Sequence, residues 1–215
     1  MKSQIDIGMI AGDGTPVKPE RVDAAANRQL ILATAEDLFA EQGVEAVTMA
    51  DIAQAAGVGK GTLYRRYANK PELCLALMHE QMLAFQNGVL ARLREFAASD
   101  TPAWRQLDFF LDALVHFTDS HLPLLCEVQR AGLLSTGHDH ESPYIWQHMT
   151  IKGLLNAAVQ SGELSPEVDV EYTADALLAP LGATLFRFQR EERGFSLERI
   201  SAGLQGMARG VFRDG

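Results

Sequence analysis

Four basic residues lie close together in a stretch that contains no acidic residue, although the whole chain carries a net charge of −9. Lys60, Arg65, Arg66 and Lys70 all fall within residues 57–70. Lysine and arginine bind phosphate groups, and arginine can also donate two hydrogen bonds to a guanine edge. The acidic chain argues against a protein that coats nucleic acid with its whole surface. The basic segment favours a small nucleic-acid-binding face.

The sequence around these basic residues has the pattern of two short helices joined by a tight turn. Residues 48–67 read TMADIAQAAGVGKGTLYRRY. Thr48 and Asp51 form a variant of the capping box at the start of the first helix. Gly57 supplies the positive φ that the turn requires. The pattern predicts a helix-turn-helix motif, whose second helix can enter the major groove of DNA.

Helical periodicity extends over most of the chain. Glycine and proline interrupt every pattern in residues 1–24, which predicts a flexible N-terminal arm. The first helix is expected to begin near Asn27 as its N-cap and to end at Gly43. No segment between turn signals alternates as a half-buried strand would. The sequence therefore predicts an all-α fold of about nine helices.

Composition excludes several classes of protein. The 215 residues are 47% hydrophobic, enough for a sizeable core, but no apolar run has the roughly 18–20 residues of a membrane span. Two cysteines cannot form a secreted disulfide scaffold, so we expect a cytoplasmic protein. There is no GxSxG, P-loop, HExxH or CxxC motif. We therefore expect no enzyme and no cofactor, and an all-α enzyme with a structural helix-turn-helix is the alternative.

Three blocks of the sequence resemble the tetracycline-repressor (TetR) family of bacterial regulators. They read RQLILATAEDLFAEQG at 28–43, TMADIAQAAGV at 48–58 and GTLYRRYANKPEL at 61–73. The resemblance implies a helix-turn-helix DNA-binding domain over residues 25–72, with its motif at 48–67. Residues 73–215 would then form a helical ligand-binding and dimerisation domain.

The resemblance also implies which residues contact DNA. They are Thr48, Lys60, Gly61, Thr62, Tyr64, Arg65, Tyr67 and Lys70. Lys60, Gly61, Thr62 and Arg65 would lie against base edges or nearby phosphates, and Lys70 would clamp a phosphate. Arg66 points roughly 100° away from Arg65 around a helix, so both cannot read bases, and its role stays open. Tyr67 could instead pack against the first helix. Gly59 stands where the family often has serine, which removes a capping hydroxyl.

Aromatic residues and methionine are frequent in the first half of the second domain. Such residues at helical spacing are more often core than ligand box, but an all-α domain that carries several of them can hold an apolar cavity. The resemblance places the family's effectors there, and we expect a small, largely apolar one. The candidate lining residues are Phe85, Trp104, Phe109, Phe117, Trp146 and Met149.

Histidines suggest a second alternative, a metal-responsive protein. His138 and His140 flank Asp139, with His148 nearby, and imidazole with carboxylate suits zinc. Such polar runs are usually just solvated, so we expect no metal site. His116 and His121 are interpreted as ordinary helix-surface or pocket residues.

The last two predicted helices, 170–192 and 196–213, each carry an apolar face. Pro180 is expected to kink or unwind the first of them. Two such helices from each of two chains would form a four-helix bundle, although both could instead pack on their own domain. The predicted dimer residues are Leu177, Leu178, Leu181, Leu185, Leu204, Met207 and Val211.

These features together predict a homodimeric repressor. It would leave a pseudo-palindromic operator when its effector binds, and an activator would use the same DNA site. A fourth helix, from about Pro71 to Ala97, would be about 40 Å long at 1.5 Å per residue. It would join the DNA-binding domain to the presumed pocket and act as a lever between them.

Overall fold

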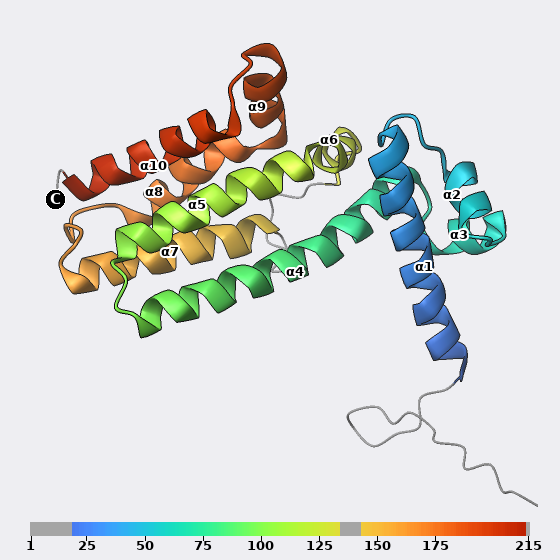
Figure 1. Ribbon diagram of the computed structural model, residues 1–215, viewed down its shortest axis with the longest axis horizontal. Coiled ribbons are helices and arrows are strands. Elements are labelled where there is room, and N and C mark those ends of the chain that lie inside the picture. Colours follow the sequence, from blue (N-terminus) through green and yellow to red (C-terminus); the bar gives the residue numbers. More distant parts are fainter. Residues whose placement is uncertain (1–18, 134–142, 214–215) are drawn as a thin grey trace, which may run out of the picture. The chain divides into compact units, whose positions relative to one another are not determined.

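The computed structural model describes residues 19–133 and 143–213, and within these ranges it contains helices and no strands (Figure 1). The all-α prediction is therefore confirmed. The chain divides into two compact units, with the boundary between Leu73 and Cys74. In the described part of the chain, no helix combines the length and the hydropathy needed to cross a bilayer.

The N-terminal unit consists of three helices and the first turn of a fourth. These are α1 (Pro19–Gln42), α2 (Met49–Ala55), α3 (Lys60–Arg66) and the start of α4 (Lys70–Ala98). The prediction for the start of α1 was wrong, because Asn27 lies inside the helix rather than at its N-cap. Residues 1–18 of the predicted arm lie outside the described residues. Gly43 ends α1 with φ +84°, and its N–H donates to the Phe39 carbonyl at 2.9 Å.

A small core fixes the crossing of these helices. Ile31 and Ala35 of α1, Ile52 and Ala53 of α2, and Leu63 of α3 are all buried. The alanines allow the helix backbones to approach closely, while the larger side chains fill the space between them. Each of the three helices thus buries one face and leaves the opposite face to solvent.

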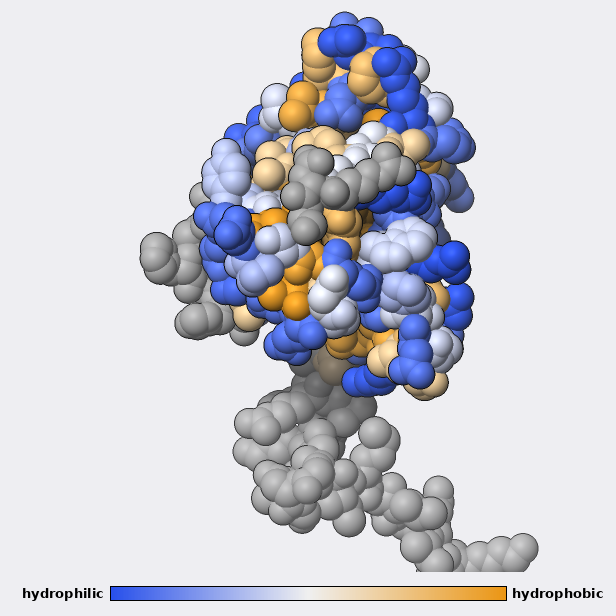
Figure 2. All heavy atoms as spheres, turned by 90° about the vertical axis from the view of Figure 1, so that its left-hand side faces the viewer, coloured by the Kyte–Doolittle hydropathy of each residue, from blue (hydrophilic) through white to orange (hydrophobic). Residues whose placement is uncertain are grey.

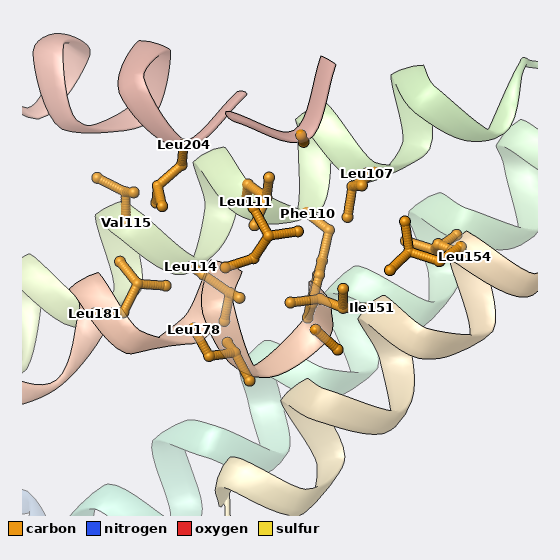
Figure 3. Packing of buried hydrophobic residues seen from close by; sticks show 14 of the residues in the cluster. Leu107, Phe110, Leu111, Leu114, Val115, Ile151, Leu154, Leu178, Leu181 and Leu204 are labelled. Atoms are coloured by element: carbon orange, nitrogen blue, oxygen red, sulfur yellow. The ribbon is translucent and has the colours of Figure 1, made fainter. Parts of the chain in front are cut away.

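The C-terminal unit is built around α5, which runs between α10 on one side and α7 on the other (Figure 1). Its elements are the rest of α4, α5 (Ala103–Ser120), α6 (Leu122–Arg130), α7 (Pro143–Ser161), α8 (Val170–Leu178), the 3₁₀ turn η1 (Ala179–Leu181), α9 (Ala183–Arg187), the π-helical turn η2 (Phe188–Glu192) and α10 (Leu197–Arg213). Leucine and phenylalanine side chains of α5 meet those of α7, α8 and α10 (Figure 3).

One end of this unit leaves part of its core visible. Figure 2 looks onto the end where α4 and α7 finish, and hydrophobic atoms show there between hydrophilic ones. Leu93 near the end of α4 and Val159 near the end of α7 are among the half-buried side chains that pack against the core.

The segment expected as one kinked helix over 170–192 is broken. Helix α8 ends at Leu178, and one 3₁₀ turn containing Pro180 follows. Gly182 is then extended, with ψ 134°, and caps α9. Pro180 lacks an N–H and its ring clashes with the preceding turn, so the helix cannot continue through it. The predicted disturbance at Pro180 is confirmed, and it is stronger than a kink.

A polar contact joins α7 to α8. Tyr144, His148 and Lys152 recur every four residues on α7 and face Glu171 and Asp175, which are four residues apart on α8. The Tyr144 hydroxyl donates to Asp175, and Lys152 pairs with Glu171. His148 is buried, with Nε2 3.3 Å from Asp175 Oδ1 and 3.7 Å from Glu171 Oε1.

The histidine run considered as a metal site can be followed only in part. His138 and His140 lie outside the described residues. His148 makes the α7–α8 contacts instead. Across the described ranges, no group of three or more His, Cys, Asp or Glu side chains is placed to hold a metal ion.

The α7–α8 contact predicts how stability depends on alkaline pH. Burial, together with the hydrogen bond and charge of Asp175, raises the pKa of Tyr144 to about 12 from its ordinary value of 10.0. The folded chain thus keeps a proton that the unfolded chain loses above pH 10. Stability from this group is therefore present below pH 10 and is lost as the pH rises toward 12. Melting temperatures measured across this range should fall less steeply for Tyr144→Phe than for the wild type.

Tyr172→Phe is the matched control, because the Tyr172 side chain is 72% exposed. This variant should keep the wild-type pH profile. Identical profiles for Tyr144→Phe and the wild type would contradict the assignment.

Candidate DNA-binding site

The turn between α2 and α3 fixes the direction of α3. The Val58 N–H donates to the Ala53 carbonyl at 3.0 Å, and the Gly57 N–H donates to the Gln54 carbonyl at 3.2 Å. This pair of bonds is a Schellman motif, which requires a left-handed residue at the position of Gly57. Gly57 has φ +64°, as the sequence predicted.

A capping box begins α2, as predicted. The Thr48 hydroxyl oxygen accepts from the Asp51 N–H at 3.3 Å, and the Asp51 carboxylate accepts from the Thr48 N–H at 2.8 Å. The Thr48 hydroxyl also donates to Asp51 Oδ2 at 2.6 Å. These bonds from Thr48 lower the pKa of Asp51. The hydroxyl proton of Thr48 is therefore engaged by Asp51, and a phosphate would have to compete for it.

Helix α3 presents a basic, solvent-facing surface. Leu63 faces the core and is fully buried, whereas Lys60, Tyr64, Arg65 and Arg66 are exposed. Gly61 is also exposed, and Thr62 is half-buried. No hydrogen bond or ion pair engages Lys60 or Arg66 within the described part of the chain. The structure thus gathers five of the eight predicted contact residues on one short exposed helix.

The N-terminus of α3 has no side-chain cap. Gly59 occupies the N-cap position with extended backbone, and only its carbonyl takes part, accepting from the N–H groups of Thr62 and Leu63. This bears out the loss of a capping hydroxyl at Gly59. A Cβ at Gly59 would come no closer than 3.9 Å to Thr62, so the fold leaves room for a serine there.

Two predicted contact residues serve the fold of this unit. Tyr67 is buried, which favours the alternative that it packs inside the domain. The Lys70 ammonium donates to the carbonyls of Val44 at 2.8 Å, Val47 at 3.1 Å and Glu45 at 3.4 Å. An ammonium has three protons, and this one directs all of them to the loop between α1 and α2. Lys70 therefore holds that loop, rather than standing ready for a phosphate.

A second capping arrangement, which sequence reasoning missed, begins α4. The Asn69 side chain accepts from the Glu72 N–H at 2.9 Å. The Glu72 carboxylate accepts from the Ala68 N–H at 2.9 Å. The signal was present as Asn followed three residues later by Glu, just before an apolar run. The box fixes the end of the loop that follows α3.

Comparisons with known proteins agree with this geometry. Residues 31–77 match the model of the bacterial regulatory proteins of the tetR family. An HTH-type transcriptional regulator of Staphylococcus aureus (strain bovine RF122 / ET3-1) is 28% identical over 178 residues, which cover 83% of this chain and 90% of that protein. This chain is therefore similar to TetR-family regulators, and the family match itself covers residues 31–77.

Solved structures of TetR-family proteins share the fold. A regulator from Pectobacterium atrosepticum has a TM-score of 0.67 at 20% identity, over 89% of this chain and 96% of that chain. Thermus thermophilus FadR, a TetR-family repressor solved in complex with lauroyl-CoA, has a TM-score of 0.63 at 21% identity, over 86% of this chain and 92% of that chain.

The aromatic residues proposed for a TetR-type effector pocket do not all come together. Phe85 of α4, Phe117 of α5 and Trp146 of α7 form one cluster, with ring centroids 4.5 Å apart for Phe85–Phe117 and 6.0 Å for Phe85–Trp146. Phe110 and His121 extend this cluster. The other three predicted residues lie elsewhere: Trp104 near Arg209, Phe109 against Phe96, and Met149 largely exposed.

The predicted dimer face also needs correction. Four of its residues are buried in the core of their own unit: Leu177, Leu178, Leu181 and Leu204. Figure 3 shows the last three of them beside α5. A side chain enclosed by its own core cannot reach a partner. Val211 is half-buried against the same core. Leu185 and Met207 are 45% and 52% exposed, and they line a groove of about 430 Å³ together with Phe188.

The structural role of Lys70 leads to a prediction. Lys70→Met removes three charge-assisted hydrogen bonds to loop carbonyls, two of them part-buried, so the free energy of unfolding should fall by about 1–3 kcal/mol. Urea unfolding measures this loss. Lys60→Met, which changes an exposed lysine without a hydrogen bond, should leave stability unchanged and weaken DNA binding. A stable Lys70→Met variant whose DNA affinity depends less steeply on salt would restore Lys70 as a phosphate contact.

Proposed function

We propose that this protein is a homodimeric repressor of the TetR family that leaves its operator when a small, largely apolar effector binds. The observation that carries the proposal is the α3 surface. A seven-residue helix presents Lys60, Arg65 and Arg66 to solvent, while its inner face is fixed by a buried core. A short helix held in this way is the element that enters the major groove in helix-turn-helix proteins. Acting on chromosomal DNA by binding, such a protein needs no catalytic site and works in the cytoplasm.

The aromatic cluster of α4, α5 and α7 supports an apolar effector. The rings of Phe85, Phe117 and Trp146 are apolar surfaces of the kind that contact an acyl or aromatic group. His121 lies at the edge of the cluster, stacked on Phe117 with ring centroids 4.1 Å apart. Its Nδ1 is held by the Phe117 carbonyl at 2.7 Å, so Nε2 is the nitrogen available to a polar group of the effector. The complex of Thermus thermophilus FadR with lauroyl-CoA makes that ligand a suitable probe.

Helix α4 supplies a covalent route for coupling effector to DNA. It begins in the N-terminal unit, where Asn69 and Glu72 cap it, and it carries Phe85 in the C-terminal unit. An effector that favours one position of Phe85 over another therefore acts on the same helix that follows α3. By linkage, an effector that weakens DNA binding must itself be bound more weakly in the presence of DNA, by the same factor.

This coupling gives the test of the proposed function. The protein should retard a duplex taken from upstream of its own gene more strongly than a scrambled duplex, and raised salt should weaken both complexes. Lauroyl-CoA should lower the affinity for the upstream duplex, and that duplex should lower the affinity for lauroyl-CoA to the same extent. Gel retardation and calorimetry measure the two halves of this cycle.

Coenzyme A without an acyl chain is the control, and it should leave DNA binding unchanged. Equal retardation of the upstream and scrambled duplexes would contradict sequence-specific DNA binding. Specific retardation with equal lauroyl-CoA affinity in the presence and absence of DNA would leave a regulator that this ligand does not control.

The exposed groove supports the homodimer. Apolar side chains from α9, η2 and α10 face solvent there, and Gly203, Gly206 and Gly210 recur along the exposed side of α10. Glycines at this spacing let a second helix approach closely. A twofold dimer also suits two recognition helices that read half-sites about 34–36 Å apart.

Met207→Glu should therefore split the dimer. The twofold axis would bring two carboxylates into an apolar seam without partners, at a cost of several kcal/mol. Sedimentation should show a helical monomer. Tyr172→Glu, also at an exposed position, should remain dimeric, and Leu181→Glu should instead unfold the C-terminal unit because Leu181 is buried. A Met207→Glu dimer of wild-type affinity would contradict this interface.

A further inference from the structure

The Arg65 side chain is held back onto its own helix. Its Nε donates to the carbonyl of Gly61, one turn earlier, at 3.1 Å. Within the described part of the chain, no other hydrogen bond or ion pair engages its guanidinium. We infer that Arg65 reads a guanine through its two terminal nitrogens, and this inference rests on the proposed operator binding.

The geometry of the guanidinium determines which of its nitrogens can bind a base. Its five N–H groups lie in one plane and offer two edges for a paired contact, one with Nε and one without it. The bond to Gly61 occupies the edge that contains Nε. The remaining edge presents the two terminal nitrogens, Nη1 and Nη2, side by side. Arg65 is therefore arranged to donate two parallel hydrogen bonds from the end of its side chain.

The base edges in the major groove differ in the hydrogen-bond acceptors that they present. Guanine presents two neighbouring acceptors, N7 and O6, which match two parallel donors. Adenine presents an acceptor beside a donor, and cytosine presents a donor. Thymine offers one acceptor beside a methyl group. Among the four bases, only guanine offers an acceptor to both terminal nitrogens of Arg65, so the base assigned to Arg65 is the guanine of a G·C pair in the major groove.

Gly61 is compatible with a close approach of DNA beside Arg65. It lies four residues before Arg65 on the same exposed face of α3. A Cβ at Gly61 would meet nothing within 4 Å, so no side chain of this chain requires a glycine there. Glycine within a helix is less stable than alanine. A glycine with free space around it fits a surface that another molecule approaches closely, beside the Arg65 guanidinium.

Arg66 provides the matched comparison. It is exposed and carries the same charge as Arg65, but it points roughly 100° away around the helix. No hydrogen bond to the α3 backbone orients it in the described structure. A substitution at Arg66 therefore shows the effect of an exposed arginine whose guanidinium is not oriented by a backbone carbonyl.

The experiment selects duplexes from a randomised pool with four proteins: the wild type, Arg65→Ala, Arg65→Lys and Arg66→Lys. The wild type should enrich a G·C pair at one symmetric pair of positions. Arg65→Lys keeps the charge but loses the planar pair of donors, so it should lose that preference, as should Arg65→Ala. Arg66→Lys should enrich the wild-type sequence. Replacing the selected G·C pairs with A·T should weaken wild-type binding by roughly 5- to 150-fold per pair, from about 1–3 kcal/mol of discrimination.

A chemical substitution isolates the contact. Placing 7-deazaguanine at the selected position removes the N7 acceptor and leaves base pairing intact. It should weaken binding of the wild type and have no effect on Arg65→Ala. Gly61→Ala should melt no lower than the wild type and yet bind the selected duplex more weakly, whereas Gly153→Ala, at an exposed glycine of α7, should bind it normally.

The outcomes separate this inference from the proposed function. If the wild type enriches no sequence, both this inference and the proposed function are contradicted. A second outcome would overturn the role of Arg65 alone. In that outcome the wild type enriches one sequence, Arg65→Lys enriches the same guanines, and 7-deazaguanine weakens binding equally in the wild type and in Arg65→Ala. Normal duplex binding by Gly61→Ala would overturn the close approach at Gly61.

Discussion

Helix α3 has seven residues, and a helix of that length is not stable in water by itself. Its existence therefore depends on the contacts that hold it. Leu63 anchors its inner face, and the Schellman turn at Gly57 sets its direction. Beyond its C-terminus, Asn69 and Glu72 fix the start of α4, from which Lys70 binds the carbonyls of the α1–α2 loop. Each of these groups is a structural residue, and together they position the exposed residues that the proposed function assigns to DNA binding.

The same contacts explain how an acidic protein presents a basic face. Because the apolar side of α3 is buried in the core, its cationic side faces solvent. The carboxylate of Asp51 accepts hydrogen bonds from Thr48 in the capping box. Lys70 instead directs its ammonium to the backbone carbonyls of the α1–α2 loop. The exposed charge is thereby concentrated on Lys60, Arg65 and Arg66, and the Gly61 carbonyl orients one of the three.

Local signals were sufficient for the N-terminal motif, because caps, turn glycines and helical spacing are properties of neighbouring residues. Thr48, Asp51 and Gly57 act as their sequence context indicates. Lys70 could not be understood in this way, since its partners lie 23 to 26 positions earlier in the chain. The α5 N-terminus shows the same limit: Glu163, 60 positions after Ala103, accepts its free N–H groups. Three-dimensional contacts, rather than composition, decide such roles.

The segment from α8 to α10 shows why an apolar pattern cannot distinguish a core from an interface. Both surfaces need leucines at helical spacing, so Leu177 and Leu185 look alike in the sequence. The break at Pro180 and Gly182 separates them: Leu177 packs into the unit before the break, and Leu185 faces solvent after it. In a continuous helix, residues eight positions apart would lie about 80° from each other, within one broad apolar stripe. The proline and glycine thus allow one short segment both to complete the core with α8 and to present a separate apolar surface from α9.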